Sequence, residues 1–147
     1  MALSKDSKEF LESLNSRVID YVIVGAHSLA FHGRPRYTGD LDILVRATPE
    51  NAAKLVDLLN HFGFAHSGFK ESDFTQPEQL IQLGRAPNRI DLLTSITGVT
   101  TDEALASKVE AELVGIPVFI LSKDALIRNK RAVGRPQDIA DLTMLES

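Results

Sequence analysis

The sequence contains no cysteine and no tryptophan, and aromatic residues make up only 6% of its 147 positions. The lack of cysteine excludes disulfide bonds, zinc–thiolate sites and cysteine-based catalysis. No apolar run approaches the roughly 20 residues that a membrane-spanning helix needs. The first ten residues, MALSKDSKEF, are too highly charged for a signal peptide. These absences predict a cytoplasmic protein that has no membrane partner.

Acidic residues outnumber basic ones, and the net charge of −4 argues against a surface dedicated to nucleic acid. The basic residues are nevertheless clustered, because five of them fall within thirteen residues, opposed only by Asp124. A local basic face of this kind serves a phosphate-bearing substrate even when the whole protein is acidic. The five residues are Lys123, Arg128, Lys130, Arg131 and Arg135.

The stretch 21–45, YVIVGAHSLAFHGRPRYTGDLDILV, is predicted to form a strand, a glycine turn, a short helix, a basic loop and a second strand. Gly25 ends the first strand, and the residues after it open the helix. The unpaired N–H groups and positive dipole end of such a helix favour a phosphate group. In the second strand, Asp40 and Asp42 share one face, because side chains alternate along a strand.

Two carboxylates side by side repel each other unless a cation holds them. The stretch therefore predicts a phosphate-binding turn beside a two-carboxylate metal site. Those are the parts that phosphoryl or nucleotidyl transfer needs. Each motif alone has an ordinary structural explanation, a solvated turn for Asp-x-Asp and tight strand–helix packing for the glycine. Their spacing on consecutive strands makes the functional interpretation more specific.

The two motifs together resemble the signature of the polymerase-β-like nucleotidyltransferase superfamily, hydrophobic-Gly-[Gly/Ser] followed by Asp-x-Asp. The run GAHSLAFHGRPRYTGDLDI further resembles a small bacterial group related to abortive-infection toxin nucleotidyltransferases. Ala26 stands at the second signature position, and Ser28 lies close enough to supply a hydroxyl. In the resembled group, the positions of Arg36 and Thr38 lie close to the nucleotide. A simple neutralisation of the two aspartates is the alternative role for the basic loop.

Asp91 lies within the second strand of a predicted hairpin, formed by residues 80–83 and 90–94. A lone aspartate in so apolar a strand requires a partner, because an unpaired buried carboxylate is unfavourable. Pairing with Arg89 or Arg85 is the structural explanation. The resemblance implies a functional one, since the superfamily takes a third metal-binding carboxylate from the next strand of the sheet. We favour the functional explanation because Asp-x-Asp lies upstream.

The last predicted helix carries Asp138 and Asp141 on its apolar stripe. Carboxylates on an apolar face need cationic partners, and Lys130 and Arg135 are the nearest in sequence. One interpretation is a salt-bridge network that ties the last two helices together. The other follows from the resemblance: the tail motif Leu-Ile-x-x-Lys-x-Ala-x-Gly-Arg-Pro-x-Asp-x-x-Asp is similar to that of the bacterial group, in which a tail lysine and aspartate assist transfer.

The sequence thus predicts a single nucleotidyltransferase-like domain over residues 1–147, of the α+β class. Its sheet is expected to be mixed and mostly antiparallel, with helices packed on one face. Residues 64–78 are interpreted as a connecting loop with buried aromatic side chains, the alternative being a mobile flap that stacks on a base.

The predicted activity is the transfer of a nucleoside monophosphate from a nucleoside triphosphate to an acceptor hydroxyl. Mg²⁺ or Mn²⁺ would be held by Asp40, Asp42 and Asp91. An RNA 3′ end is placed slightly ahead of a protein or small-molecule acceptor. The alternative is a catalytically weak or inactive partner protein, for example one half of a toxin–antitoxin-type module. The residues expected to bind the nucleotide are Gly25, Ala26, Ser28, Arg36, Thr38, Lys130 and Arg135, with Lys130 also assisting catalysis.

Overall fold

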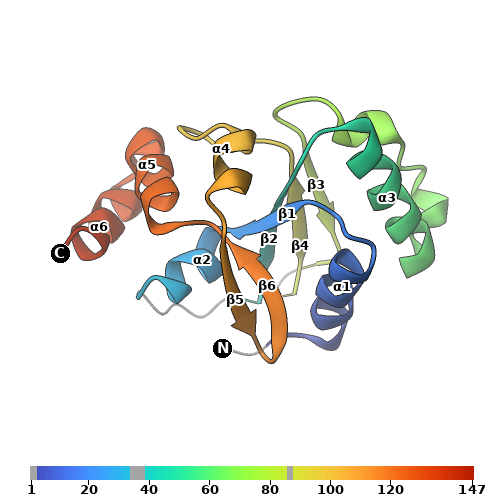
Figure 1. Cartoon of the computed structure of the whole chain (residues 1–147), viewed down its shortest axis with the longest axis horizontal. Coiled ribbons are helices and arrows are strands. Elements are labelled where there is room, and N and C mark those ends of the chain that lie inside the picture. The colour runs from blue at the N-terminus through green and yellow to red at the C-terminus, as the bar shows by residue number, and fades with distance from the viewer. Residues whose placement is uncertain (1–2, 34–38, 86–87) are drawn as a thin grey trace.

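A computed structural model of the chain describes residues 3–33, 39–85 and 88–147. Six strands form one sheet in the order β3-β4-β2-β1-β6-β5 (Figure 1). The strands are β1 (Tyr21–Val24), β2 (Leu41–Val45), β3 (Leu80–Leu83), β4 (Ile90–Leu93), β5 (Val109–Leu113) and β6 (Ile116–Ile120). The α-helices are α1 (Lys5–Ser16), α2 (Gly25–Phe31), α3 (Pro49–Leu59), α4 (Thr101–Ala106), α5 (Lys123–Val133) and α6 (Pro136–Leu145).

The sheet is mixed, as the sequence predicts. Three neighbouring pairs are antiparallel, namely β1 with β2, β3 with β4, and β5 with β6. Two pairs are parallel, β1 with β6 and β2 with β4. The parallel pairing of β2 with β4 matters most for the site, because it sets the two predicted aspartate-bearing strands side by side.

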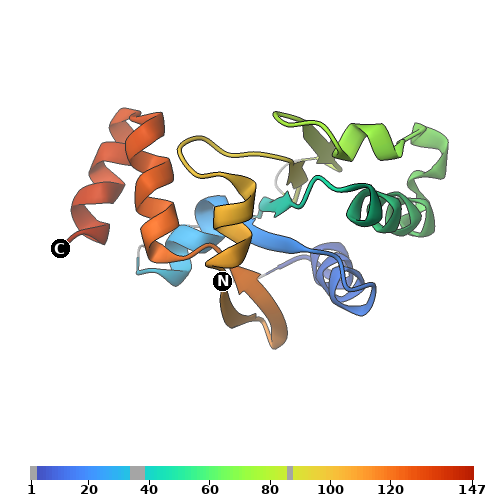
Figure 2. The same ribbon diagram turned by 45° about the horizontal axis from the view of Figure 1, so that its top comes forward.

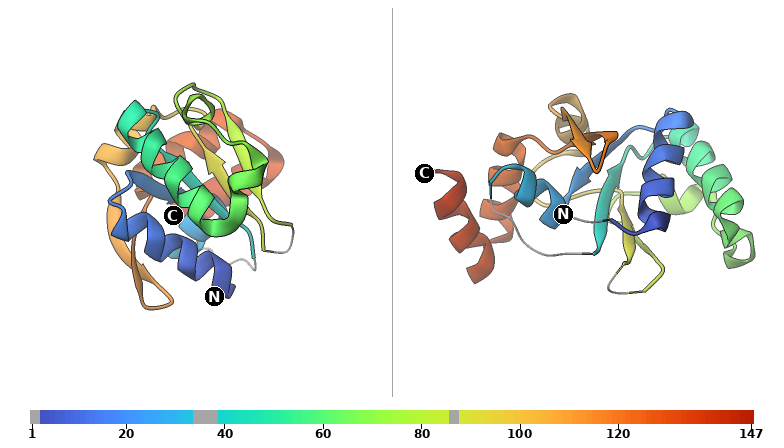
Figure 3. Two further views of the ribbon diagram at one scale, coloured as in Figure 1. Left: turned by 90° about the vertical axis from the view of Figure 1, so that its right-hand side faces the viewer. Right: turned by 90° about the horizontal axis from the view of Figure 1, so that it is seen from below.

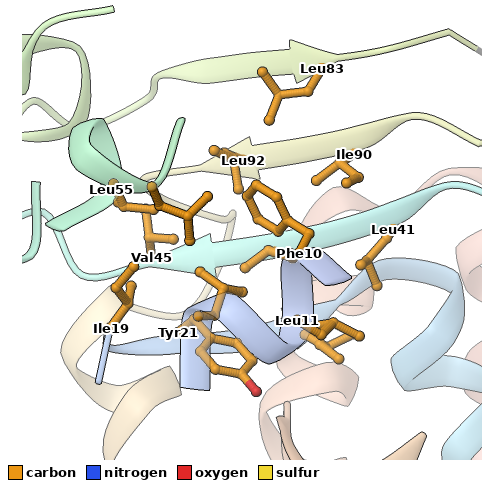
Figure 4. Packing of buried hydrophobic residues seen from close by; sticks show 14 of the residues in the cluster. Phe10, Leu11, Ile19, Tyr21, Leu41, Val45, Leu55, Leu83, Ile90 and Leu92 are labelled. Carbon is orange, nitrogen blue, oxygen red and sulfur yellow. The ribbon is translucent and has the colours of Figure 1, made fainter. Parts of the chain in front are cut away.

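Helices cover both faces of the sheet, whereas the sequence analysis expected them on one. One apolar cluster joins α1 and α3 to the sheet, and Figure 4 shows its side chains meeting around Phe10 and Tyr21. A second cluster joins α2, α4, α5 and α6 to the opposite face. The physical reason lies in β1, whose four consecutive residues are all buried. A strand whose consecutive residues are all apolar is buried on both faces, so helices must cover both sides of the sheet there.

Different helices lie at the two ends of the molecule. Helices α5 and α6 stand together at one end of the molecule, and α3 with the short helical turns after it stands at the other (Figures 1 and 2). The view from below separates the same two groups (Figure 3, right). Within the residues described here, no helix is long and apolar enough to cross a membrane.

Side-chain caps set several helix boundaries that the sequence marks. Thr48 caps α3 ahead of Pro49, and Ser122 caps α5. Thr100 and Glu103 form a capping box at the start of α4. The first helix begins at Lys5 with Ser4 as its cap.

Residues 64–78 agree with the interpretation as a connecting segment. They form short helical turns, η2 (Ala65–Ser67) and η3 (Glu71–Phe74), after η1 (Asn60–Phe64). Phe74 is fully buried in the cluster of α1 and α3, and Phe69 packs against that cluster. The segment therefore belongs to the face of the sheet opposite the predicted aspartates, and its aromatic side chains pack on the protein core.

Candidate active site

The predicted carboxylates come from neighbouring strands. Asp42 on β2 is the register partner of Asp91 on β4, so both side chains leave the sheet on the same face. That face is opposite to the one on which Leu41 and Ile43 join the core. Asp40 lies just before β2, where its Oδ1 accepts a hydrogen bond of 2.9 Å from the backbone N–H of Arg89. All three carboxylates thus gather where β2 and β4 begin.

The electrostatics of this cluster are dominated by excess negative charge. Burial, the charge and hydrogen bonding of Asp91 and, to a smaller extent, the charge of Asp40 together raise the pKa of Asp42 to about 7. Arg89 acts in the opposite direction. A carboxyl group that keeps its proton close to neutral pH marks a site short of positive charge.

Gly25 places backbone directly against Asp42. Its φ of +69° lies in the left-handed region, and a Cβ added there would sit 2.2 Å from Oδ2 of Asp42. Only glycine meets both requirements without displacing the carboxylate. Helix α2 starts at this residue, and no described side chain caps it. Ser28 is buried, and its Oγ donates to the carbonyl of Gly25 over 2.8 Å, so its hydroxyl is engaged within the turn.

A cavity of about 320 Å³ opens beside Asp42 and Gly25. Its polar wall includes Ser95, Thr97 and Asn129, which the sequence analysis did not single out. The amide Nδ2 of Asn129 donates to the carbonyl of Thr97 over 2.8 Å, which fixes α5 to the loop after β4. No local sequence signal marks these residues, because they come from segments that only the fold brings together.

His27 is a further polar residue of this region that the sequence analysis did not single out. It lies on α2 and is 3% exposed, and neither ring nitrogen finds a hydrogen-bond partner among the described residues. Burial lowers the pKa of the imidazole, so we expect a neutral ring at pH 7.

The chemistry of the donor set suits Mg²⁺ or Mn²⁺, since only carboxylate oxygens converge here. However, no group of three or more His, Cys, Asp or Glu side chains in the described part of the chain is placed to hold a metal ion as it stands. Arg89 pairs with one of these carboxylates. Its Nε and Nη2 donate to Oδ1 and Oδ2 of Asp91 over 2.7 and 3.1 Å. The structural explanation for Asp91, pairing with a nearby arginine, is therefore present in the form of Arg89.

The tail residues form a buried charge network between α5 and α6. Nζ of Lys130 lies 3.2 Å from Asp138 and 3.0 Å from Asp141, and both aspartates are at most 1% exposed. Arg135 pairs with Asp138 over 2.7 Å, and its hydrogen bonds together with that of Lys130 lower the pKa of the Asp138 carboxyl to about 2. This arrangement matches the predicted salt-bridge network. Lys130 does not line the cavity beside Asp42, and its catalytic role stays a prediction.

The remaining predicted nucleotide-binding residues fall in two groups. Ala26 is the second residue of α2 and is partly exposed beside Gly25. Arg36 and Thr38 lie outside the described residues.

A family model described as "Nucleotidyl transferase of unknown function (DUF2204)" matches residues 3–147. The chain belongs to this family. The match confirms the resemblance at the level of nucleotidyltransferases, and the family implies a nucleoside triphosphate as substrate. The link to the toxin-related group stays a prediction. A comparison with curated proteins finds no match.

Solved structures share the fold of this chain. TM1012 from Thermotoga maritima, assigned as a nucleotidyltransferase, has a TM-score of 0.63 and 16% identity, over 94% of this chain and 88% of that one. The lincosamide antibiotic adenylyltransferase LnuA, solved with lincomycin bound, has a TM-score of 0.58 and 14% identity, over 98% and 96%. The antibiotic-resistance factor ANT(2'')-Ia has a TM-score of 0.54 and 16% identity, over 95% and 80%. At these identities, the likeness establishes the fold alone.

Proposed function

We propose that this protein transfers a nucleoside monophosphate from a nucleoside triphosphate to an acceptor hydroxyl. The observation that carries the proposal is the register pairing of Asp42 with Asp91, with the backbone of Gly25 packed against the Asp42 carboxylate. A nucleotide turn and a carboxylate cluster on adjoining strands are the parts that this reaction uses.

In this reaction the acceptor oxygen bonds to the α-phosphorus, the bond from that phosphorus to the β-phosphate oxygen breaks, and pyrophosphate leaves. Mg²⁺ or Mn²⁺ held by Asp40, Asp42 and Asp91 would neutralise the phosphates and lower the pKa of the acceptor hydroxyl. The turn from Gly25 to Ser28 would hold the phosphates through its backbone N–H groups. The carboxylate of Asp91 would take the proton of the hydroxyl.

The nucleotide and the acceptor are the open parts of this proposal, and one experiment addresses both. Purified protein is incubated with Mg²⁺, each α-phosphate-labelled nucleoside triphosphate in turn, and total RNA, a cell extract or small alcohols. We expect label in one acceptor class, and none with Asp40→Asn/Asp42→Asn. Absence of transfer under all conditions would contradict the proposal. It would favour the inactive partner protein, for which Ala26 at the second signature position is the supporting feature.

An RNA 3′ end remains our first candidate acceptor, because basic residues cluster on α5 and just after it. Ion pairs within the protein reduce the positive charge that this cluster can present to RNA. Arg128 pairs with Glu103, Arg131 with Glu146, and Arg135 with Asp138, each within 2.8 Å. A small-molecule hydroxyl is therefore the main competing acceptor, and one structure with this fold is a lincosamide antibiotic adenylyltransferase solved with lincomycin bound.

If RNA is the acceptor, its binding should weaken steeply with salt, because phosphate contacts release counterions. Arg131→Glu should then reduce RNA affinity and leave triphosphate affinity nearly unchanged, as measured by filter binding and fluorescence titration. Lys5→Glu, on α1, makes the same change of charge away from the tail and should have little effect. If RNA binding is absent at low salt while label reaches a small molecule or protein, the RNA assignment is wrong.

A further inference from the structure

Arg89 stands inside the carboxylate cluster and contacts two of its three members. Its guanidinium forms a two-point pair with Asp91, at 2.7 and 3.1 Å. The same group lies 3.7 Å from Oδ2 of Asp40, whose other oxygen accepts from the backbone N–H of Arg89 at 2.9 Å. A single residue therefore binds the first and the third carboxylate.

The pair uses both oxygens of Asp91. A planar guanidinium that matches a carboxylate in this way is the strongest arrangement that an arginine makes. Any cation that approaches Asp91 meets oxygens that already accept hydrogen bonds and a positive charge beside them. The Asp91 side chain is 9% exposed, so water screens this repulsion only in part.

Arg89 can also leave. Its side chain is 31% exposed, so the guanidinium can move into solvent on its flexible stem. The backbone hydrogen bond to Asp40 does not depend on the guanidinium, because it comes from the main-chain N–H. The contact that would break is the one to Asp91, and the contact that aims Asp40 would remain.

We propose that Arg89 is an internal counter-ion that competes with the divalent ion for the carboxylate cluster. Without metal, its guanidinium offsets the repulsion between Asp40, Asp42 and Asp91 and keeps them together. When metal binds, the guanidinium withdraws from Asp91. This inference rests on the proposed function, since it takes the metal site from it. Arg89 is thus a positioning residue, and its presence raises the metal concentration at which the site fills.

The chain offers a matched control in Arg46. This arginine also bridges two carboxylates, Asp20 at 3.0 Å and Asp102 at 2.7 Å, and its side chain is 32% exposed. It follows the last residue of β2, whereas the carboxylate cluster lies where that strand begins. Removing its charge therefore changes the net charge equally without touching the predicted metal ligands.

The test is calorimetric titration of Mn²⁺ at about pH 8 into four proteins: wild type, Arg89→Gln, Arg89→Lys and Arg46→Gln. We expect Arg89→Gln to bind Mn²⁺ about tenfold more tightly or better, the change expected on loss of a charge-assisted two-point pair. Arg89→Lys, which keeps the charge but loses the planar fork, should fall between it and the wild type. Arg46→Gln should match the wild type.

A second measurement requires no substitution at Arg89. In the wild type, the NMR signal of the Arg89 Nε–H should move on titration with Mg²⁺, and that of Arg46 should stay in place. If Arg89→Gln fails to fold, as judged by circular dichroism, Arg89→Lys and this signal decide the matter.

The outcomes separate the two proposals. Wild-type binding of Mn²⁺ with unchanged or weaker binding in Arg89→Gln would overturn the competition and leave the metal site standing. It would mean that Arg89 orients Asp91 for the metal. No binding in the wild type or in any variant would overturn the metal site itself, and the competition with it.

Discussion

Replacing Asp42 by asparagine should stabilise the metal-free protein, although it removes a predicted ligand. The carboxyl of Asp42 is pressed against Gly25 and paired in register with Asp91. Its negative charge is disfavoured by burial and by its neighbours, which raise its pKa to about 7. An amide of the same shape carries no charge and can donate to Asp91, as the protonated carboxyl can.

The magnitude follows from proton linkage. The ordinary pKa of the group is 3.8 and the folded value is about 7, so the folded state binds more protons than the unfolded state between these values. The contribution of Asp42 to stability is therefore fully present below about pH 4 and is lost as pH rises through 7. At about 1.36 kcal/mol per pH unit, the whole gap corresponds to roughly 4 kcal/mol. Solvent reaches part of the group, so we expect about 2 kcal/mol.

The assay is urea denaturation followed by circular dichroism, with a chelator present, at about pH 4 and about pH 8. Wild type and Asp42→Asn should have nearly equal free energies of unfolding at the lower pH. At the higher pH the variant should be more stable, by about 2 kcal/mol. A difference that does not change with pH, or a variant that is less stable at pH 8, would refute the reasoning.

Metal should reverse this order. Saturating Mn²⁺ raises the melting temperature of a protein that binds it only when folded. We therefore expect a large rise for the wild type and a small one for Asp42→Asn. Unchanged Mn²⁺ affinity in the variant, measured by calorimetry, would count decisively against Asp42 as a ligand.

Two further substitutions test the turn and the tail. Gly25→Ala should weaken triphosphate binding in a fluorescence titration, because its Cβ would lie 2.2 Å from Oδ2 of Asp42; unchanged affinity would contradict the close packing of this turn. Lys130→Met should lower the free energy of unfolding by about 3 kcal/mol or more, because it leaves the buried Asp138 and Asp141 without their shared cation. Unchanged stability in urea together with lost transfer would instead support a catalytic lysine.

The sequence predicts much of the fold because its local signals agree with the tertiary structure. The apolar strand that ends at Gly25, the hairpin of β3 and β4, and the capping residues all mark elements that the structure contains. The placement of the helices on the two faces of the sheet is predicted less well. Four consecutive buried residues in β1 indicate burial on both faces, but which helices cover each face depends on contacts between distant segments.

The candidate site divides in the same way. Asp40, Asp42 and Asp91 are recognisable because an acidic residue in or beside an apolar strand requires a reason. The pairing of Arg89 with Asp91 was one of two arginine partners considered, and strand alternation favours it, since residues two apart share a face. Asn129 carries no comparable signal, because its place beside the cavity depends on how α5 packs against the loop after β4.

The tail shows why a structural and a functional interpretation of one motif need not exclude each other. Asn129 lines the cavity and its amide holds the carbonyl of Thr97. The next residue, Lys130, points to α6, where Asp138 and Asp141 hold it. Consecutive helical residues differ by about 100° in direction, so one turn of α5 serves both purposes.

It follows that the charge network fixes the helix that forms one wall of the cavity. Loss of Lys130 would remove one of the contacts that hold α5 against α6, so the wall would be held less firmly even if the lysine never touched a nucleotide. A loss of transfer in Lys130 variants therefore assigns no catalytic role by itself. Only a loss of transfer at unchanged stability, measured on the same variant, would separate an ammonium group that acts on the phosphates from one that holds two helices together.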